Sequence, residues 1–179
     1  MVTATAAQKD FTLEEFIANP LDRMEWVDGK IVEKNGATLK HGKIQSRLGC
    51  AWANYRTLSK HGGEVYISPP CRTSLNIRRP DVAYLTPELV AQFGNLATLP
   101  QSFPLIAEIV SPTDIAEDVF LKAQEYLASS CQEVWLVFPE SLLIFVMTQD
   151  RILTFRSGDT ATTQQILLGF SIEVDRLLA

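Results

Sequence analysis

A short apolar segment in the middle of the chain, FPLIAEIV at residues 103–110, places the strongest constraint on the fold. Pro104 and the Ser111-Pro112 pair bound it, and it is too short for an ordinary helix. A run that is apolar at nearly every position is typical of a strand buried on both faces of a sheet. We therefore expect this segment to lie inside a central sheet.

Helical and strand patterns alternate around this segment. Residues 38–60 are predicted to form a long helix, because Ile44, Leu48 and Trp52 recur at helical spacing, and a second helix is predicted from about residue 113 to 129. The predicted core strands span residues 64–69, 78–85, 104–110 and 133–138. Together these elements predict a mixed α/β (α+β) fold in which helices flank a central mixed sheet.

Additional elements are expected before and after this core, which spans about residues 38–138. A capping-box pattern and an Asp-Gly turn predict a short helix and a hairpin within residues 12–34. The remaining predictions are a short helix at 87–93, extra C-terminal strands within 141–178 that include one at 162–169, and a final helix at 170–178. We expect residues 1–179 to form a single domain.

The composition fits one ordinary globular domain. Of 179 residues, 46% are apolar and 21% are charged, which excludes global disorder. No apolar run approaches the roughly 20 residues that span a bilayer, and no secretory signal is evident, so we expect no membrane association and a cytoplasmic location. The three cysteines form no CxxC pair, which argues against a disulfide framework and against a cysteine zinc site.

The net charge is −5, but one segment of the chain is basic. Residues 37–63 contain five lysines and arginines and no acid. Lys40, Lys43 and Arg47 are three and four positions apart, so they share one face of the predicted helix. This face and His41 are predicted to contact nucleic-acid phosphates, and the alternative is an ordinary solvated helix face.

Two acids stand in apolar strand segments. Glu108 shares a strand face with Ile106 and Val110, where a carboxylate is costly to bury unless it is paired, protonated or metal-bound. Asp81 follows Pro80 and begins the segment DVAYL. If the two strands are neighbours, the carboxylates could hold a divalent cation. The alternatives are a turn or cap role for Asp81, and a buried ion pair or a water-facing strand end for Glu108.

Lys122 lies at the edge of the apolar stripe of the second helix. Its stem could run along the sheet and carry the ammonium into a polar pocket, and the alternative is a surface ion pair with Asp118. Two acids and a lysine suit phosphodiester hydrolysis, because Mg²⁺ prefers carboxylate and water ligands and a lysine can orient or help deprotonate the attacking water. The backbone carbonyl of Ile109 is a further candidate metal ligand.

These segments, in this order, resemble the Uma-two family of endonucleases, abundant in cyanobacteria, which is placed in the PD-(D/E)XK nuclease superfamily. The matching motifs are PDVA at 80–83, E-x-V-S-P at 108–112, K-x-x-x-Y at 122–126 and EVWLVFPE at 133–140. The resemblance extends over about residues 20–178. It implies a restriction-endonuclease-like core and a Mg²⁺- or Mn²⁺-dependent endonuclease acting on DNA, with Asp81 and Glu108 as metal ligands.

The sequence departs from the superfamily pattern at two places. The D/E-x-K motif would put a lysine at position 110, where the chain has Val110, so the resemblance implies that Lys122 takes the role of that lysine. The first core helix also lacks an acid that many superfamily members carry there. Candidates to replace it, or to assist the site in another way, are His41, Glu25, Glu64 and Tyr126.

Two other functions stay open. A nuclease fold that has lost catalysis would act as a nucleic-acid-binding or protein-interaction module, which the acidic overall balance favours. The second is a structural oligomer that stabilises another factor: the apolar run LLIFVM at 142–147 would suit a subunit interface, so a homodimer or higher homo-oligomer is expected. A serine hydrolase and a nucleotide-binding loop have no support, because the motifs G-x-S-x-G, G-x-x-x-x-G-K-S/T and G-x-G-x-x-G are absent from the sequence.

Overall fold

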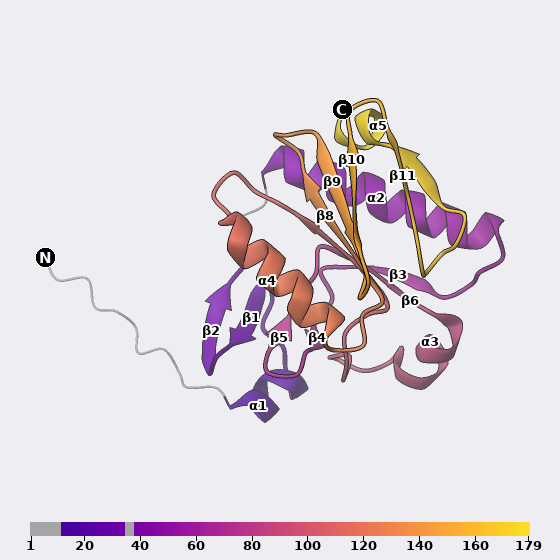
Figure 1. Cartoon of the computed structure of the whole chain (residues 1–179). Coiled ribbons are helices and arrows are strands. Elements are labelled where there is room, and N and C mark those ends of the chain that lie inside the picture. The colour runs from indigo at the N-terminus through magenta and orange to yellow at the C-terminus, as the bar shows by residue number, and fades with distance from the viewer. Residues whose placement is uncertain (1–11, 35–37) are drawn as a thin grey trace, which may run out of the picture.

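The computed structural model describes residues 12–34 and 38–179, and their centre is a six-stranded mixed sheet (Figure 1). Its strands are β3 (Glu64–Ile67), β6 (Val82–Leu85), β7 (Leu105–Ile109), β8 (Glu133–Phe138), β9 (Leu143–Met147) and β10 (Ile152–Arg156). They lie in the order β10-β9-β8-β7-β6-β3. The β7–β8 pair is parallel and the other pairs in this sheet are antiparallel.

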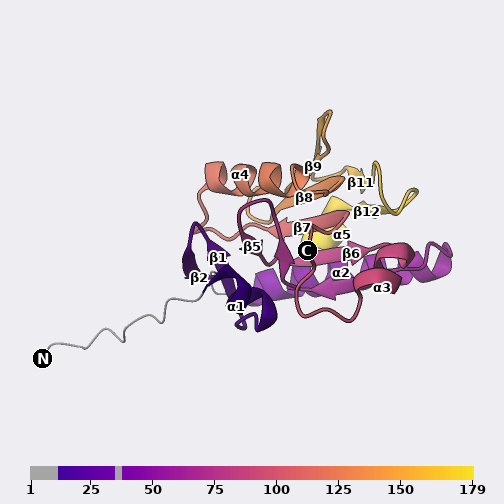
Figure 2. The same cartoon turned by 90° about the horizontal axis from the view of Figure 1, so that it is seen from below.

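Helices α2 (Leu39–Leu58) and α4 (Ala116–Leu127) cover opposite faces of this sheet (Figure 2). Strand β7 is buried at all five positions, as its apolar sequence predicts. Leu105 and Ile109 pack in the core that contains Trp52 of α2, whereas Ile106 packs in the core that contains Tyr126 of α4. Because strand side chains alternate between faces, Glu108 lies on the α4 side.

The predicted N-terminal helix and hairpin are both present. A smaller sheet contains β1 (Met24–Val27), β2 (Lys30–Glu33), β4 (Cys71–Arg72) and β5 (Ile77–Arg78), in the order β2-β1-β5-β4. Helix α1 (Leu13–Ala18) begins with the predicted capping box of Thr12 and Glu15, and helix α3 (Pro87–Phe93) follows β6. Trp26 in β1 pairs with Ile77 in β5, so the hairpin is tied to the chain that leads into the central sheet.

The strand predicted at residues 78–85 is divided between the two sheets. Arg78 ends β5 in the small sheet, and β6 begins at Val82 in the large one. Pro80, which has no N–H to donate to a ladder, lies at the break. The Arg79 guanidinium donates to the backbone carbonyls of Met24, Ser68 and Leu21, which fixes the crossing segment. Asp81 is therefore held where the two sheets meet.

The C-terminal part differs from its prediction in two respects. It contains β11 (Thr160–Thr162), β12 (Ser171–Glu173) and α5 (Val174–Leu178), so residues 163–169 are not the expected strand and the final helix begins four residues later than expected. The N–H groups of Gln164 and Gln165 are satisfied by the buried Glu133 carboxylate instead of a neighbouring strand.

The apolar run at residues 142–147 is largely covered within the chain. Strand β9 lies between β8 and β10, and Ile144 and Val146 are fully buried on the α2 side. On the other side Phe145 contacts Phe120 and Phe138 at ring-centroid distances of 5.6 and 5.5 Å. A subunit interface is thus not needed to bury these side chains, and the oligomeric state stays a prediction.

Candidate active site

Asp81 is almost completely buried, and its carboxylate is held by hydrogen bonds from neighbouring donor groups. Oδ2 accepts hydrogen bonds from the Ile109 N–H at 2.7 Å and from His41 Nε2 at 3.1 Å. Oδ1 accepts from Lys34 Nζ at 2.6 Å. Burial alone would raise the pKa of Asp81, but the charge of Lys34 and the hydrogen bond from His41 hold this pKa far below its usual value. Asp81 is therefore ionised.

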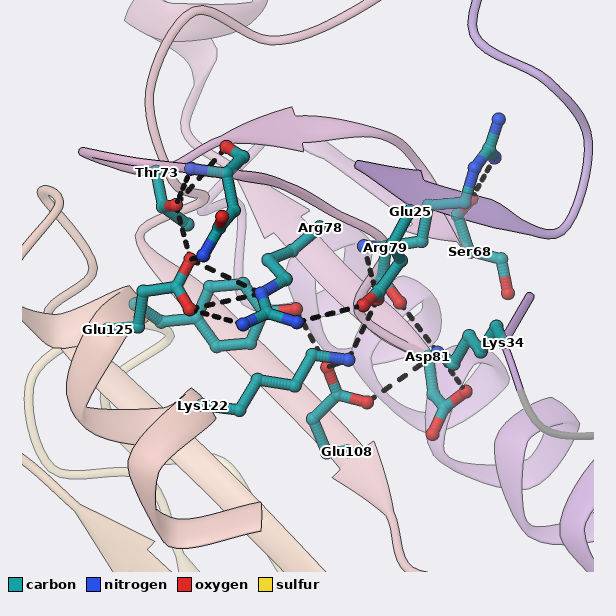
Figure 3. Close-up of polar contacts among 12 residues, drawn as sticks. Glu25, Lys34, Ser68, Thr73, Arg78, Arg79, Asp81, Glu108, Lys122 and Glu125 are labelled. Carbon is teal, nitrogen blue, oxygen red and sulfur yellow. Dashed lines mark hydrogen bonds and ion pairs between the residues drawn. The ribbon is translucent and has the colours of Figure 1, made fainter. Parts of the chain in front are cut away.

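Glu108 lies beside Asp81, as expected if two neighbouring strands hold the pair. Its Oε1 accepts from the Tyr126 hydroxyl at 2.8 Å and lies 3.0 Å from Lys122 Nζ. Its Oε2 lies 3.5 Å from Lys34 Nζ, the same ammonium that contacts Asp81. The two buried carboxylates thus converge on a single cation (Figure 3). Of the alternatives for Glu108, the buried ion pair is present, with Lys122 and Lys34, and the water-facing strand end is not, because the side chain is buried. Asp81 lies at a bend directly before β6.

Lys122 reaches the pocket from α4, as its position at the edge of the apolar stripe predicts. Its ammonium lies 2.8 Å from Glu25 Oε1 and 3.0 Å from Glu108 Oε1. These carboxylates, and not Asp118, are its partners. Burial alone would lower the pKa of Lys122, but Glu108 and Glu25 outweigh burial and raise it well above its usual value. Lys122 is consequently a fixed positive charge and hydrogen-bond donor.

A chain of alternating charges extends from these residues to the small sheet (Figure 3). Its members in spatial order are Asp81, Lys34, Glu108, Lys122, Glu25, Arg78 and Glu125. Glu25 on β1 accepts from Lys122, from Arg78 Nη1 at 3.2 Å and from the Arg79 N–H at 2.9 Å. Burial opposes its ionisation, but Lys122 overcomes that effect and lowers the pKa of Glu25 to about 2. The hairpin therefore supplies part of the candidate site.

The charged chain borders a cavity of about 630 Å³ between α4, β7 and the hairpin. Its acidic lining residues are Glu25, Asp28, Glu33, Asp81, Glu108, Asp114, Asp118 and Glu125, whereas its lysines and arginines are Lys34, Arg78 and Lys122. Because eight carboxylates and three lysine or arginine side chains line it, the cavity has an excess of acidic groups and attracts cations. A phosphate group would enter it favourably only if a cation offset this excess.

The basic face of α2 is arranged differently from the expectation. His41 is buried against Asp81, away from the exposed Lys43 on the same helix. Lys40 pairs with Glu140 at 2.9 Å, and the Arg47 guanidinium donates to the backbone carbonyl of the C-terminal Ala179. Phosphate binding by this face remains a prediction, since two of its cations already have partners within the protein.

The donor set near Lys34 fits one hard divalent cation. The Asp81 and Glu108 carboxylates converge there, and Mg²⁺ commonly takes one or two carboxylates and completes its shell with water. Among residues 12–34 and 38–179, no three His, Cys, Asp or Glu side chains gather as a metal-ligating cluster, so the fit rests on Asp81 and Glu108. The Ile109 N–H is bonded to Asp81, and the Ile109 carbonyl as a ligand stays a prediction.

Several residues of the site have no evident signal in the sequence. Lys34 and Arg78 join the charged chain through the β1–β5 pairing, which no local pattern predicts. Glu125 accepts from Arg78, Asn76 and Thr73, and it follows Lys122 on α4 by three residues, which places both on neighbouring helix positions. Of the candidate auxiliary residues, Glu64 pairs with Arg56 outside the cavity lining.

The mixed sheet between two helices, with two buried acids and a lysine at one cavity, defines a restriction-endonuclease-like nuclease fold. The chain matches the family described as "Putative restriction endonuclease" (Uma2) over residues 9–175, and it belongs to that family. The resemblance read from the motifs is thereby confirmed.

A solved structure from Anabaena variabilis, described as "a putative nuclease belonging to DUF820", shares the fold with a TM-score of 0.82. The two sequences are 19% identical, and the match covers 94% of this chain and 97% of the other. No curated protein matches the chain in the corresponding search. Within the part of the chain that the structure describes, no helix has the length and apolar character needed to cross a membrane.

Proposed function

We propose that the protein is a metal-dependent endonuclease that hydrolyses phosphodiester bonds in DNA. The observation that supports this most directly is the convergence of the buried Asp81 and Glu108 carboxylates on one cationic nitrogen, at 2.6 and 3.5 Å. In the proposed site these two acids hold Mg²⁺ or Mn²⁺, together with the Ile109 carbonyl. The membership of the family and the shared nuclease fold are consistent with this chemistry.

Each residue of the site has a defined task in this proposal. A bound divalent cation offsets the negative charge of the phosphate and polarises the attacking water. Asp81 is kept ionised by Lys34 and His41, and the Tyr126 hydroxyl fixes the orientation of Glu108. The Lys122 ammonium orients the attacking water and stabilises the negative charge that develops on the phosphate.

Nicking of a supercoiled plasmid tests the proposal. With Mg²⁺ or Mn²⁺ the wild-type protein converts supercoiled plasmid to open circles, and chelation of the metal stops the conversion. Asp81→Asn and Glu108→Gln each slow it by about 100-fold or more, which is the usual scale for loss of an electrostatic catalytic group. The matched control is Glu64→Gln, because Glu64 is paired with Arg56 outside the cavity and its loss leaves the rate unchanged. Equal nicking by all four proteins would refute the proposal.

A second candidate function, binding of nucleic acid without cleavage, is favoured by the ion pairs that Asp81 and Glu108 already make with Lys34, because these pairs use the oxygens that a metal would need. Such a module would bind DNA through the basic face of α2, with an affinity that falls steeply with salt and does not require a metal. Detection of that binding, with no nicking by the wild-type protein in Mn²⁺, would favour this function over the endonuclease.

A further inference from the structure

Lys34 occupies a position that is built like a cation site. It follows the last residue of β2, and its Nζ lies 2.6 Å from Asp81 Oδ1, 2.6 Å from the Arg79 carbonyl oxygen and 3.5 Å from Glu108 Oε2. Its side chain is 19% exposed, so the ammonium is largely withdrawn from water. Two carboxylates and one backbone carbonyl are the kinds of oxygen ligand that hard divalent cations take.

An ammonium and a divalent cation cannot use these oxygens together. Both are compact positive charges, and a Mg²⁺ ion must approach its ligands to about 2.0–2.1 Å, closer than the ammonium does. Lys34 has a flexible four-carbon stem and borders the cavity of about 630 Å³. Its ammonium can therefore leave the two acids by rotation of the side chain, without movement of the small sheet.

We propose that Lys34 is a built-in competitor of the metal. In the metal-free protein its ammonium holds Asp81 and Glu108 together and offsets their mutual repulsion, so the ligand pair is assembled before any metal arrives. Binding of the divalent cation requires the ammonium to move into the cavity. The inference rests on the proposed function, since it takes Asp81 and Glu108 as the metal ligands, and it adds that Lys34 sets the metal concentration at which the site fills.

A Mn²⁺ titration followed by electron paramagnetic resonance of the free ion tests this role without an activity assay. We expect Lys34→Gln to bind Mn²⁺ at least about tenfold more tightly than the wild type, because a like charge beside the ligands is removed. Lys30→Gln is the matched control, since Lys30 is an exposed lysine on β2, the strand that precedes Lys34, and the Mn²⁺ affinity of this variant should equal that of the wild type. Asp81→Asn should abolish the binding.

The outcomes separate the two proposals. If the wild type binds Mn²⁺ in an Asp81-dependent manner but Lys34→Gln binds equally or more weakly, the competitor role is overturned and the metal site survives. If Asp81-dependent binding is absent from the wild type and from Lys34→Gln, both proposals are overturned.

Thermal unfolding gives a second readout that also applies if Lys34→Gln is less stable than the wild type without metal. Loss of the Lys34 ammonium leaves two buried acids less well compensated, so Lys34→Gln should melt below the wild type in chelator, and saturating Mn²⁺ should raise its melting temperature more than that of the wild type. An equal or smaller rise, or a variant that Mn²⁺ cannot refold, would overturn the inference.

Discussion

Substitution of Glu25 by Gln tests the charged chain that joins the hairpin to the candidate site. Gln keeps the shape of the side chain but removes the charge that faces Lys122 and Arg78. The pKa of Glu25 is lowered from 4.5 to about 2 in the folded protein. At roughly 1.4 kcal/mol for each unit of pKa, the ionised carboxylate contributes about 3 kcal/mol to the free energy of unfolding at pH 7.

The sign of the pH dependence follows from this lowered pKa. A carboxylate whose folded pKa lies below its unfolded pKa contributes its full stability above the unfolded value of 4.5, and the contribution is lost as the pH falls toward the folded value of about 2. The free energy of unfolding of the wild type should therefore exceed that of Glu25→Gln by about 3 kcal/mol at pH 7 and by about half as much at pH 3.

Urea unfolding of both proteins at these two pH values measures the difference. Glu33→Gln is the control, because Glu33 is an exposed acid on the same hairpin, and its effect should stay within about 0.5 kcal/mol. A Glu25→Gln difference below about 1 kcal/mol at pH 7, or one that does not shrink at pH 3, would refute the account of the charged chain.

Three further predictions concern other parts of the molecule. Arg47→Ala removes the hydrogen bond to the Ala179 carbonyl and should lower the melting temperature by about 2–4 °C in calorimetry; an unchanged melting temperature would show that this anchor is dispensable. One of the three thiols, the exposed Cys50, should react quickly with a thiol reagent in the native protein, and rapid reaction of a second thiol would contradict the burial of the others. Gly63→Ala should lower the free energy of unfolding in urea by more than about 1 kcal/mol, because φ of Gly63 is +71° and a Cβ would lie 2.2 Å from the Leu85 carbonyl oxygen. An unchanged free energy of unfolding would contradict that geometry.

Local patterns in the sequence predict the core of the fold well. The apolar run at 103–110 indicates a doubly buried strand, and the spacing of Ile44, Leu48 and Trp52 indicates the helix that covers one face. Both predictions depend on residues close together in the chain. The break between Arg78 and Val82 was not predicted, because it depends on where two sheets meet and on carbonyls that Arg79 contacts from distant segments.

The same distinction explains what could be predicted of the site. Asp81, Glu108 and Lys122 are conspicuous because each is a charged residue in or beside an apolar pattern, and the structure brings all three to one cavity. Lys34 follows a polar, partly exposed hairpin strand in which a lysine is ordinary. Its role becomes visible only through the pairing of β1 with β5, which carries the hairpin to the edge of the central sheet.

The most direct test of the proposed metal centre is a crystal of the protein soaked in Mn²⁺ and measured for anomalous scattering. The account predicts a peak within ligand distance of both the Asp81 and Glu108 carboxylates, with the Lys34 ammonium moved away from Asp81. A Mn²⁺ peak elsewhere in the cavity, or no peak at saturating Mn²⁺ with Lys34 still on Asp81, would contradict it.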